Sequence, residues 1–423
     1  MPPSLSLADW LARLERLHPS AIELGLDRVR RVKDAMGLAP DFPLIIVGGT
    51  NGKGSTCAYL EAILGAAGYR TGLYTSPHLL HYNERVRIAG RSASDAELVH
   101  AFERVDAARG DTSLTYFEFG TLGAMAQFIE AAVDVAILEV GLGGRLDAVN
   151  VFDADAAIVT SVDLDHMDYL GDTREKIGFE KAGIYRAGRP AICSDPVPPV
   201  SLVEHARKIG ARLHCIDREF SILREGDVWT FRGQDTFLPA LPLPTMAGSC
   251  QLRNAAGALA ALATLTERLP ANEKAVRQGL VAAQVPGRFQ RVSRSPDIIL
   301  DVAHNPEAAR ALAATLREQP VAGRTLAVVG MLADKDASAV FAALSDEIDA
   351  WWTCTPVSPR ARAASALADI LRSSLGSVAV TVQPDVNAAL AEARSTARDG
   401  DRILVFGSFL TVAAVLDHAA TQQ

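Results

Sequence analysis

The sequence lacks the features that mark a membrane or exported protein. No apolar run approaches the roughly 20 residues that a helix needs to cross a bilayer. The opening stretch, MPPSLSLADWLARLERL, has neither a basic start nor an apolar signal core. Its leucines and tryptophan are instead spaced along one face of an amphipathic helix. We therefore expect a cytoplasmic protein with no membrane partner.

Cysteine and positive charge are also scarce. The five cysteines are scattered, and none forms a CxxC pair, which disfavours a disulfide framework or a structural zinc site. The 42 Lys and Arg residues are outnumbered by 50 Asp and Glu, giving a net charge of -8. This balance disfavours nucleic acid as a general partner. The sequence also has no Asn-Lys-x-Asp segment for base recognition, which disfavours a GTPase.

The most informative stretch that is present is PLIIVGGTNGKGS, residues 43–55. A buried-strand pattern over 44–47 runs through a glycine-rich turn into a helical pattern over 56–67. Glycines let the backbone approach phosphate oxygens, the helix N-terminus offers unpaired N–H groups, and Lys53 supplies a cation. We interpret the stretch as a phosphate-binding loop. The alternative is an ordinary glycine-rich connection, because Gly54 stands where the P-loop formula has Ser or Thr.

The chain is long enough for two domains. We expect a P-loop domain over residues 1–285, a hinge at 286–288 where proline and glycine interrupt a helical pattern, and a C-terminal domain over 289–423. Alternating strand and helix patterns predict an α/β fold with a mostly parallel sheet in the first domain and a smaller, Rossmann-like α/β second domain. A small antiparallel excursion is expected over 218–238.

Polar residues follow several of the predicted strands. Ser76 follows the strand 69–75, and Glu139 ends the strand over 135–138. Asp163, Asp165 and His166 follow the next strand. Ligands of open parallel sheets bind beyond the carboxyl ends of the strands, so these side chains are expected at one edge. A carboxylate at such a strand end, in a chain with a P-loop, predicts a magnesium site.

Eight short motifs occur in the order found in one family of amide-forming ligases. They are GTNGKGS (49–55), TSPHL (75–79), LTYFEF (114–119), LEVGLGGRLDA (138–148), LDH (164–166), EKAGI (180–184), PGRFQ (286–290) and DVAHNP (301–306). Together they make the chain resemble the bacterial dihydrofolate synthase/folylpolyglutamate synthases of the Mur ligase superfamily. The combination is far more specific than any single motif.

The resemblance implies ATP and Mg²⁺ as cofactors, and it assigns residues to both. ATP is expected to contact Asn51, Gly52, Lys53, Gly54 and Ser55 in the loop, with Asn254, Arg288 and Asp301 from outside it. Magnesium is expected on Ser76, Glu139 and His166, and a second metal on Lys181 after carbamylation. The family further implies catalytic roles for Lys53, Lys181 and His304.

Several of these residues have alternative interpretations. Ser and Glu oxygens suit Mg²⁺, but imidazole is an unusual ligand for it, so His166 is also interpretable as a hydrogen-bonded loop histidine. Lys181 is interpretable as a solvated helix lysine, and it follows Phe179, where close relatives are expected to have Arg. For the ATP contacts, the alternatives are a polar helix residue at Asn254, a linker cation at Arg288 and a strand-end cap at Asp301.

The pterin end of the acceptor is the other site that the resemblance implies. Its expected residues lie in three segments, namely Glu23, Leu24, Gly25 and Leu26; Thr115, Tyr116, Phe117 and Glu118; and Leu146, Asp147 and Ala148. Glu23 stands where Asp is expected.

The implied reaction adds L-glutamate to 7,8-dihydropteroate and to reduced folates through an acyl phosphate, in a monomeric enzyme. One alternative is a folylpolyglutamate synthase with that single activity. A muramyl-type ligase is a further alternative, but such enzymes carry a domain ahead of the P-loop, where only about forty residues stand here. A protein that uses ATP only to switch conformation belongs to a different class. Stimulation of its ATPase by pteroate and glutamate together would distinguish a ligase from it.

Overall fold

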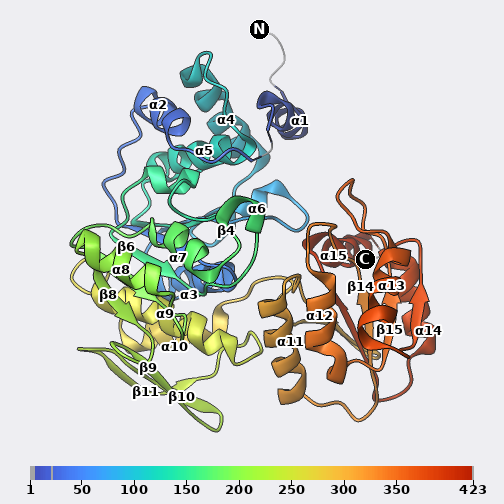
Figure 1. The fold of residues 1–423 in the computed structure, drawn as a ribbon. Helices are drawn as coiled ribbons and strands as arrows, with labels where there is room; N and C mark the ends of the chain where they lie inside the picture. The colour runs from blue at the N-terminus through green and yellow to red at the C-terminus, as the bar shows by residue number, and fades with distance from the viewer. Residues whose placement is uncertain (1–4, 21, 422–423) are drawn as a thin grey trace. The chain divides into compact units, whose positions relative to one another are not determined.

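The computed structural model describes residues 5–20 and 22–421, and it divides the chain into two compact units. Unit 1 runs to Thr245 and includes Leu252–Ala283, whereas unit 2 comprises Met246–Gln251 and the chain from Gln284 onward. Among the described residues, no helix has the length and apolar character required to cross a bilayer. Figure 1 labels the elements of both units.

Unit 1 is built on an eight-stranded sheet in the order β4-β3-β2-β5-β1-β6-β7-β8. Its strands are β1 (Leu44–Gly48), β2 (Thr71–Tyr74), β3 (Val86–Ile88), β4 (Arg91–Ser92), β5 (Val135–Glu139), β6 (Ala156–Val159), β7 (Pro190–Cys193) and β8 (Arg212–Cys215). Six strands run parallel, and only the β2–β3 and β3–β4 pairs are antiparallel. Each residue of β1 is buried, as its unbroken apolar pattern predicts for a central parallel strand.

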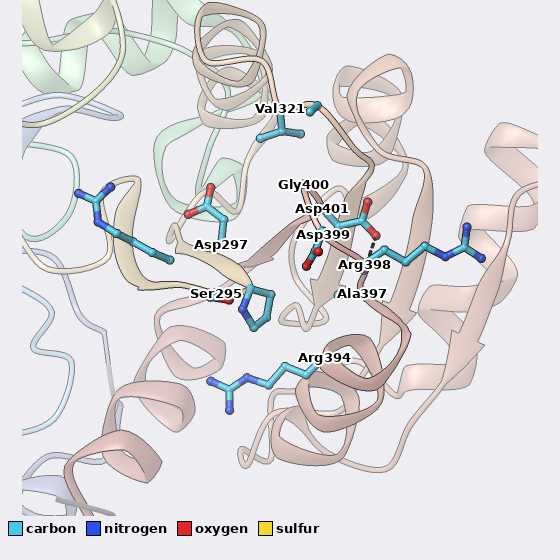
Figure 2. Close-up of a pocket in the computed structure, with 12 residues that line it drawn as sticks. Ser295, Asp297, Val321, Arg394, Ala397, Arg398, Asp399, Gly400 and Asp401 are labelled. Atoms are coloured by element: carbon cyan, nitrogen blue, oxygen red, sulfur yellow. Dashed lines mark hydrogen bonds between the residues drawn. The ribbon is translucent and has the colours of Figure 1, made fainter.

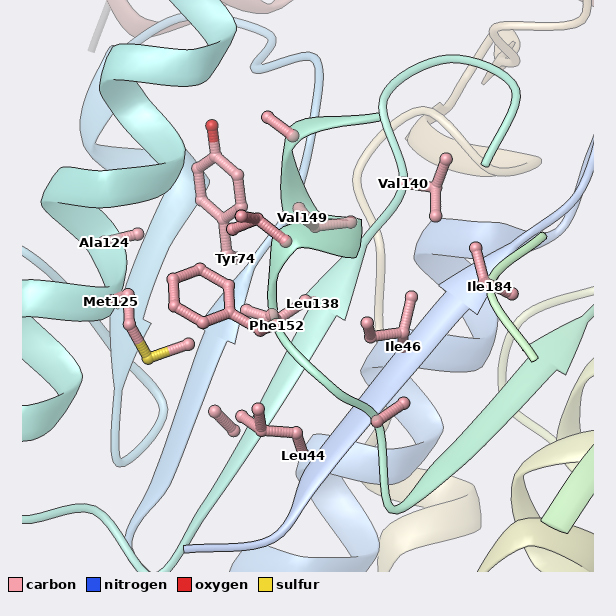
Figure 3. Packing of buried hydrophobic residues seen from close by; sticks show 14 of the residues in the cluster. Leu44, Ile46, Tyr74, Ala124, Met125, Leu138, Val140, Val149, Phe152 and Ile184 are labelled. Atoms are coloured by element: carbon pink, nitrogen blue, oxygen red, sulfur yellow. The ribbon is translucent and has the colours of Figure 1, made fainter. Parts of the chain in front are cut away.

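Helices surround this sheet. They are α1 (Leu7–Leu17), α2 (Asp27–Ala35), α3 (Lys53–Ala66), α4 (Asp95–Arg109), α5 (Tyr116–Glu130), α6 (Met167–Leu170), α7 (Arg174–Ala182), α8 (Val200–Ile209), α9 (Cys250–Thr264) and α10 (Glu273–Ala282), with short 3₁₀ turns η1 (Tyr82–Arg85) and η2 (Ala148–Val151). Helices α1, α2, α4 and α5 pack together (Figure 1). Figure 3 shows the buried core, where Ile46 of β1 and Leu138 of β5 lie among Tyr74, Met125 and Phe152.

A separate three-stranded sheet confirms the antiparallel excursion in unit 1. Its strands are β9 (Ser221–Glu225), β10 (Val228–Arg232) and β11 (Phe237–Pro242), paired in the order β11-β10-β9. The last strand extends a few residues beyond the predicted range of 218–238. Trp229, Thr230 and Phe231 of the central strand are all buried.

Unit 2 contains a six-stranded sheet in the order β12-β13-β17-β14-β15-β16. Its elements are β12 (Gln290–Arg294), β13 (Asp297–Leu300), α11 (Pro306–Glu318), β14 (Thr325–Val329), α12 (Ala337–Leu344), η3 (Ser345–Glu347), β15 (Ala350–Thr353), α13 (Ala364–Leu375), β16 (Val380–Val382), α14 (Val386–Thr396), β17 (Arg402–Phe406) and α15 (Phe409–Thr421). Every pair except β12–β13 is parallel. The predicted α/β fold class is therefore confirmed, and β12 is an edge strand that the sequence did not predict.

Candidate nucleotide and substrate sites

The phosphate-loop candidate is a tight turn between β1 and α3. Gly52 lies just before the first residue of α3 with φ of 84°, a left-handed conformation that favours glycine. A Cβ atom on Gly52 would lie 2.3 Å from Oδ1 of Asn254, so the predicted outside residue packs directly against the loop. Gly54 and Ser55 belong to the first turn of α3, whose N–H groups have no partner within the helix.

The end of β6 holds this loop in shape. The Thr160 hydroxyl donates to the carbonyl of Asn51 at 2.5 Å, and the Asn51 N–H donates to the Ser161 hydroxyl at 3.0 Å. The N–H of Thr50 donates to the Ser161 carbonyl at 2.8 Å. Thr160 and Ser161 were not among the predicted site residues, although their place at a strand end was a usable signal. Their hydrogen bonds preorganise the loop for a phosphate group.

Lys53 bends back over the turn that precedes it. Its Nζ donates to the carbonyl oxygens of Gly49 at 3.1 Å and Thr50 at 3.0 Å. Its charge also reaches Asp147, because Lys53 is one of the groups that lower the pKa of that carboxyl. The ammonium group therefore lies at the loop, where a phosphate oxygen can replace a carbonyl as its acceptor.

The strand-end carboxylate lies beside the same loop. Glu139 is the last residue of β5 and is buried. Its Oε2 accepts the backbone N–H of Ser76 at 3.0 Å, and a Cβ atom on Gly54 would lie 3.9 Å from both of its carboxylate oxygens. Ser76, Glu139 and the phosphate loop are thus brought together, as predicted for a site shared by nucleotide and metal.

The chemistry of this group fits a magnesium ion. Mg²⁺ prefers oxygen ligands and usually keeps waters and substrate phosphates, with only one or two protein carboxylates. In residues 5–20 and 22–421, no three His, Cys, Asp or Glu side chains gather closely enough to form a metal cage of their own. Glu139 and the Ser76 hydroxyl would supply oxygen ligands to such an ion.

His166 precedes the short helix α6 and adopts a left-handed conformation with φ of 51°. Its N–H donates to Oδ1 of Asp165 at 2.9 Å, and its ring Nε2 lies 3.9 Å from Oδ2 of the same residue. With a side chain 36% exposed, it stays accessible to a ligand. The predicted metal role of His166 remains a prediction.

Lys181 lies in the last turn of α7 and is only 4% exposed. Its interpretation as a solvated helix lysine is therefore wrong. A buried ammonium group is costly unless it is paired or chemically modified. The preceding Phe179 and Glu180 both contact Arg145, through its guanidinium 5.7 Å from the Phe179 ring and an ion pair of 2.8 Å to Glu180. Phe179 therefore accepts a cation on its ring face.

The three segments predicted for the pterin end meet in unit 1. The Gly25 N–H donates to the carbonyl of Leu146 at 3.2 Å. Arg28 joins the first segment to the second, because it pairs with Glu23 and donates from Nη2 to Oε1 of Glu118 at 3.0 Å. Arg28 was not among the predicted residues, because the predicted segment ended at Leu26. This arginine now links two of the predicted segments.

The remaining members of these segments contribute apolar side chains, a helix cap and aromatic rings. Leu24 and Leu26 are partly buried, and Ala148 is buried. Thr115 caps α5, with its hydroxyl accepting the Glu118 N–H at 3.2 Å. The guanidinium of Arg85 lies 5.5 Å from the Tyr116 ring, and the Phe117 ring lies 5.6 Å from that of Tyr74.

Asp147, in the third pterin segment, is a buried carboxyl that the charge of Lys53 reaches. Oδ2 accepts the N–H of Leu142 at 2.8 Å, and Oδ1 accepts that of Val149 at 3.1 Å. Burial raises its pKa from 3.8 to about 7, while these hydrogen bonds and the charge of Lys53 act in the opposite direction. Asp147 can therefore gain or lose a proton near neutral pH.

Two of the candidates in unit 2 lie beside one aromatic ring. The guanidinium of Arg288 lies 5.4 Å from the Phe409 ring, and the His304 ring lies 6.1 Å from it. Asp301 accepts the N–H groups of Phe289 and Ala303, each at 2.8 Å. Burial raises the pKa of Asp301, and Arg288 opposes that shift. Phe409, the first residue of α15, was not predicted, although it follows a strand end.

Comparison with known proteins covers nearly the whole chain. Two family models match, the Mur ligase middle domain over residues 47–193 and the Mur ligase glutamate ligase domain over residues 287–409. A relative from Escherichia coli (strain K12), named dihydrofolate synthase/folylpolyglutamate synthase, is 46% identical over 413 residues, which are 97% of this chain and 95% of that protein.

Two solved structures are similar over the full length of both chains. E. coli FolC in complex with DHPP and ADP is 44% identical, with a TM-score of 0.95 and coverage of 100% of each chain. A bifunctional folylpolyglutamate synthase/dihydrofolate synthase with Mn, AMPPNP and L-glutamate bound is 46% identical, with a TM-score of 0.91 and the same coverage.

Proposed function

Because the chain belongs to the dihydrofolate synthase/folylpolyglutamate synthase family of Mur ligases, we infer that it uses ATP to join L-glutamate to 7,8-dihydropteroate and to reduced folates. The observation that carries this function is the 46% identity over 97% of the chain to an enzyme of that name. The geometry of unit 1 supports it, since a preorganised phosphate loop lies beside a buried strand-end carboxylate.

The chemistry requires activation of the acceptor. A carboxylate is a poor electrophile, so its oxygen first attacks the γ-phosphorus of ATP, giving an acyl phosphate and ADP. The amine of L-glutamate then attacks the acyl carbon, a proton is lost, and phosphate leaves as the amide forms. The protein forms no covalent bond in this sequence, so its task is positioning and charge stabilisation.

The phosphate loop performs that task in unit 1. The N–H groups of the first turn of α3 and residues Asn51, Gly52, Gly54 and Ser55 hold the phosphates, and Lys53 offsets charge as the two anions approach. Ser76, Glu139 and His166 hold Mg²⁺, which supplies further positive charge at the phosphates when bound. Asn254 contacts the nucleotide from its place against Gly52.

Lys181 acts as a carbamylated side chain that holds a second metal. Its burial supports this role, because carbamylation replaces a buried cation with an anion that a divalent metal can neutralise. Mass spectrometry of the intact protein, prepared with and without bicarbonate, tests this assignment. A carbamate is labile, so the native mass must be measured without acid.

The remaining assignments concern the acceptor and the residues of unit 2. The pterin end binds between the segments Glu23–Leu26, Thr115–Glu118 and Leu146–Ala148, with Arg28 fixing the first two. In unit 2, Arg288 and Asp301 contact the nucleotide, and His304 takes part in the reaction beside them. The proximity of Arg288 and His304 to Phe409 supports a shared ligand.

Oxygen transfer tests the proposed path. Dihydropteroate labelled with ¹⁸O in its carboxylate is incubated with the protein, ATP, Mg²⁺ and L-glutamate, and the released phosphate is analysed by mass spectrometry. An acyl phosphate delivers one labelled oxygen to each phosphate, because the bridging oxygen leaves with phosphorus. Unlabelled phosphate, formed at the same rate as the amide, contradicts the proposed intermediate.

A further inference from the structure

A polar cavity of about 410 Å³ lies in unit 2, among residues that the nucleotide assignments do not use (Figure 2). Its lining includes Arg294, Asp297, Val321, Arg394, Arg398, Asp399 and Asp401. These residues come from the β12–β13 turn, the segment before β14, and the end of α14 with the turn that follows it. The volume lies within the range of roughly 300–1,000 Å³ typical of small-molecule sites.

Backbone contacts and one ion pair hold two of the turns at this cavity in place. The N–H of Gly323 donates to the carbonyl of Gly400 at 2.9 Å, and a Cβ atom on Gly323 would lie 2.3 Å from Oδ1 of Asp401. Asp401 accepts the backbone N–H of Arg398 at 3.0 Å, which Figure 2 marks with a dashed line, and pairs with Arg324 at 2.7 Å. The two turns are therefore fixed by backbone contacts and one ion pair.

The walls carry positive charge that has no internal partner. In the part of the chain that the structure describes, the guanidinium groups of Arg294, Arg394 and Arg398 form neither an ion pair nor a hydrogen bond. All three residues are exposed. Their guanidinium groups are therefore available to a ligand from solution.

The acidic residues of the cavity do not cancel that charge. Asp401 is paired with Arg324, and Asp297 is paired with Arg291 at 2.7 Å and lies 3.8 Å from buried Arg402. The lining residues and these pairing partners together include six arginines and three aspartates. This leaves an excess of three positive charges. Only Asp399 competes for the three available arginines.

The cavity is distinct from the proposed nucleotide contacts of unit 2. Asp297 and Arg402 begin the parallel strands β13 and β17 and lie opposite each other in register. Asp301 and His304 follow the other end of β13. A strand of this length spans roughly 13 Å at 3.3 Å per residue. The cavity therefore lies near the amino ends of the parallel strands, whereas the proposed nucleotide contacts lie at their carboxyl ends.

We propose that this cavity is a second ligand site, which binds a small polyanion carrying at least two phosphate or carboxylate groups. Guanidinium groups present paired N–H donors that match the oxygens of either anion. Arginines at three positions in the lining of one polar cavity suit a ligand with several charges, and two sources share that chemistry. One is a phosphorylated metabolite, and the other is a γ-linked oligoglutamate.

Calorimetric titration of the full-length protein tests the proposal. The proposed nucleotide site is kept saturated with ADP at fixed free Mg²⁺, and the probes are tripolyphosphate and tri-γ-glutamate in separate titrations. We expect binding of at least one probe. We further expect R394Q/R398Q to weaken that binding by about tenfold or more, because two charge-assisted contacts are lost. R294Q provides an independent variant on a different wall.

The matched control is R207Q/R372Q, which removes the same charge from exposed arginines on α8 and α13. It should bind the probe as the unaltered protein does. Binding of tripolyphosphate alone identifies a phosphate ligand, and binding of tri-γ-glutamate alone identifies a carboxylate ligand. Failure of both probes to bind, or equal affinity in the cavity variants and the control, overturns the proposal. Ligase activity should persist in all of these variants.

Discussion

At the scale of single residues, the proposed pterin end is notable for the charges buried there. Glu118 is 3% exposed and depends on Arg28 as its cation, whereas Asp147 is buried and held by backbone N–H groups alone. The first carboxylate is neutralised by a partner. The second is accommodated by a raised pKa, so the two are expected to respond differently to pH and to mutation.

Asp147 should make stability depend on pH. Its pKa rises from 3.8 to about 7 on folding, so between these values the folded state holds a proton that the unfolded state has lost. Its contribution to stability is therefore greatest below the lower value, falls as pH rises through the window, and is constant above about 7. Relative to the unaltered protein, D147N should gain up to about 4 kcal/mol between pH 4 and pH 7.

Urea denaturation of both proteins, without ligands, at a series of pH values measures this difference. The absolute stability of D147N is less informative, because an amide replaces one accepting oxygen with a donor. A difference between the two proteins that is the same at every pH would contradict the raised pKa.

Replacing Arg28 should weaken acceptor binding more than ATP binding. Replacing it by Met leaves Glu118 buried without its cation and releases the Glu23 segment, at a cost of about 1–3 kcal/mol. We expect R28M to raise the KM for 7,8-dihydropteroate about tenfold or more and to change the KM for ATP less than about threefold. Steady-state kinetics with each substrate varied gives both values.

The control for Arg28 is R30M on the same helix, because Arg30 is exposed and, among the residues described, its ion pair is with Asp27 at 3.5 Å. An exposed pair of this kind contributes little to stability. If R28M and R30M show the same KM values, Arg28 has no role at the pterin end.

At the scale of elements, the turn into α3 is where sequence and geometry agree most closely. The strand, the glycine turn and the helix follow one another as the apolar patterns predict, and Gly52 has the conformation that its place requires. Lys53 holds the turn from within, and the end of β6 and Asn254 contact it from elsewhere in the chain. The turn is therefore a preformed feature of unit 1.

Gly52→Ala should disrupt this turn. The new Cβ atom would meet Asn254 at 2.3 Å, and a left-handed conformation costs an L-residue roughly 1–2 kcal/mol. We expect the KM for ATP to rise about tenfold or more. Gly65→Ala, within the same helix, meets no atom within 4 Å and should leave ATP use unchanged while stabilising the protein by about 0.5–1 kcal/mol. Equal KM values for ATP in the two variants would refute the preformed turn.

At the scale of the whole molecule, the chain consists of two α/β units, and the residues that we propose for nucleotide binding come from both. The mostly parallel character of both main sheets followed from alternating strand and helix patterns, because parallel strands need helical crossovers. β12 was missed because its polar sequence, QRVSR, has the pattern of a loop and pairs only along one edge. Arg28 and Phe409 were missed because their contacts join residues far apart in the chain, which no local periodicity encodes.

Arg288 of unit 2 tests whether both units serve the nucleotide. R288M should raise the KM for ATP about tenfold, since a charge-assisted contact to phosphate is lost. The control is R291M, three residues along, where the side chain pairs with Asp297 in an exposed ion pair. A KM for ATP that is unchanged in R288M would restrict nucleotide binding to unit 1.

The ligase function is tested most directly by ADP release from the purified protein with Mg²⁺, ATP and L-glutamate, with either 7,8-dihydropteroate or tetrahydrofolate as acceptor. We predict turnover with each acceptor that requires L-glutamate and yields one amide product for each ADP. Turnover with one acceptor only would assign a single activity. Turnover that continues unchanged without L-glutamate would contradict the ligase function.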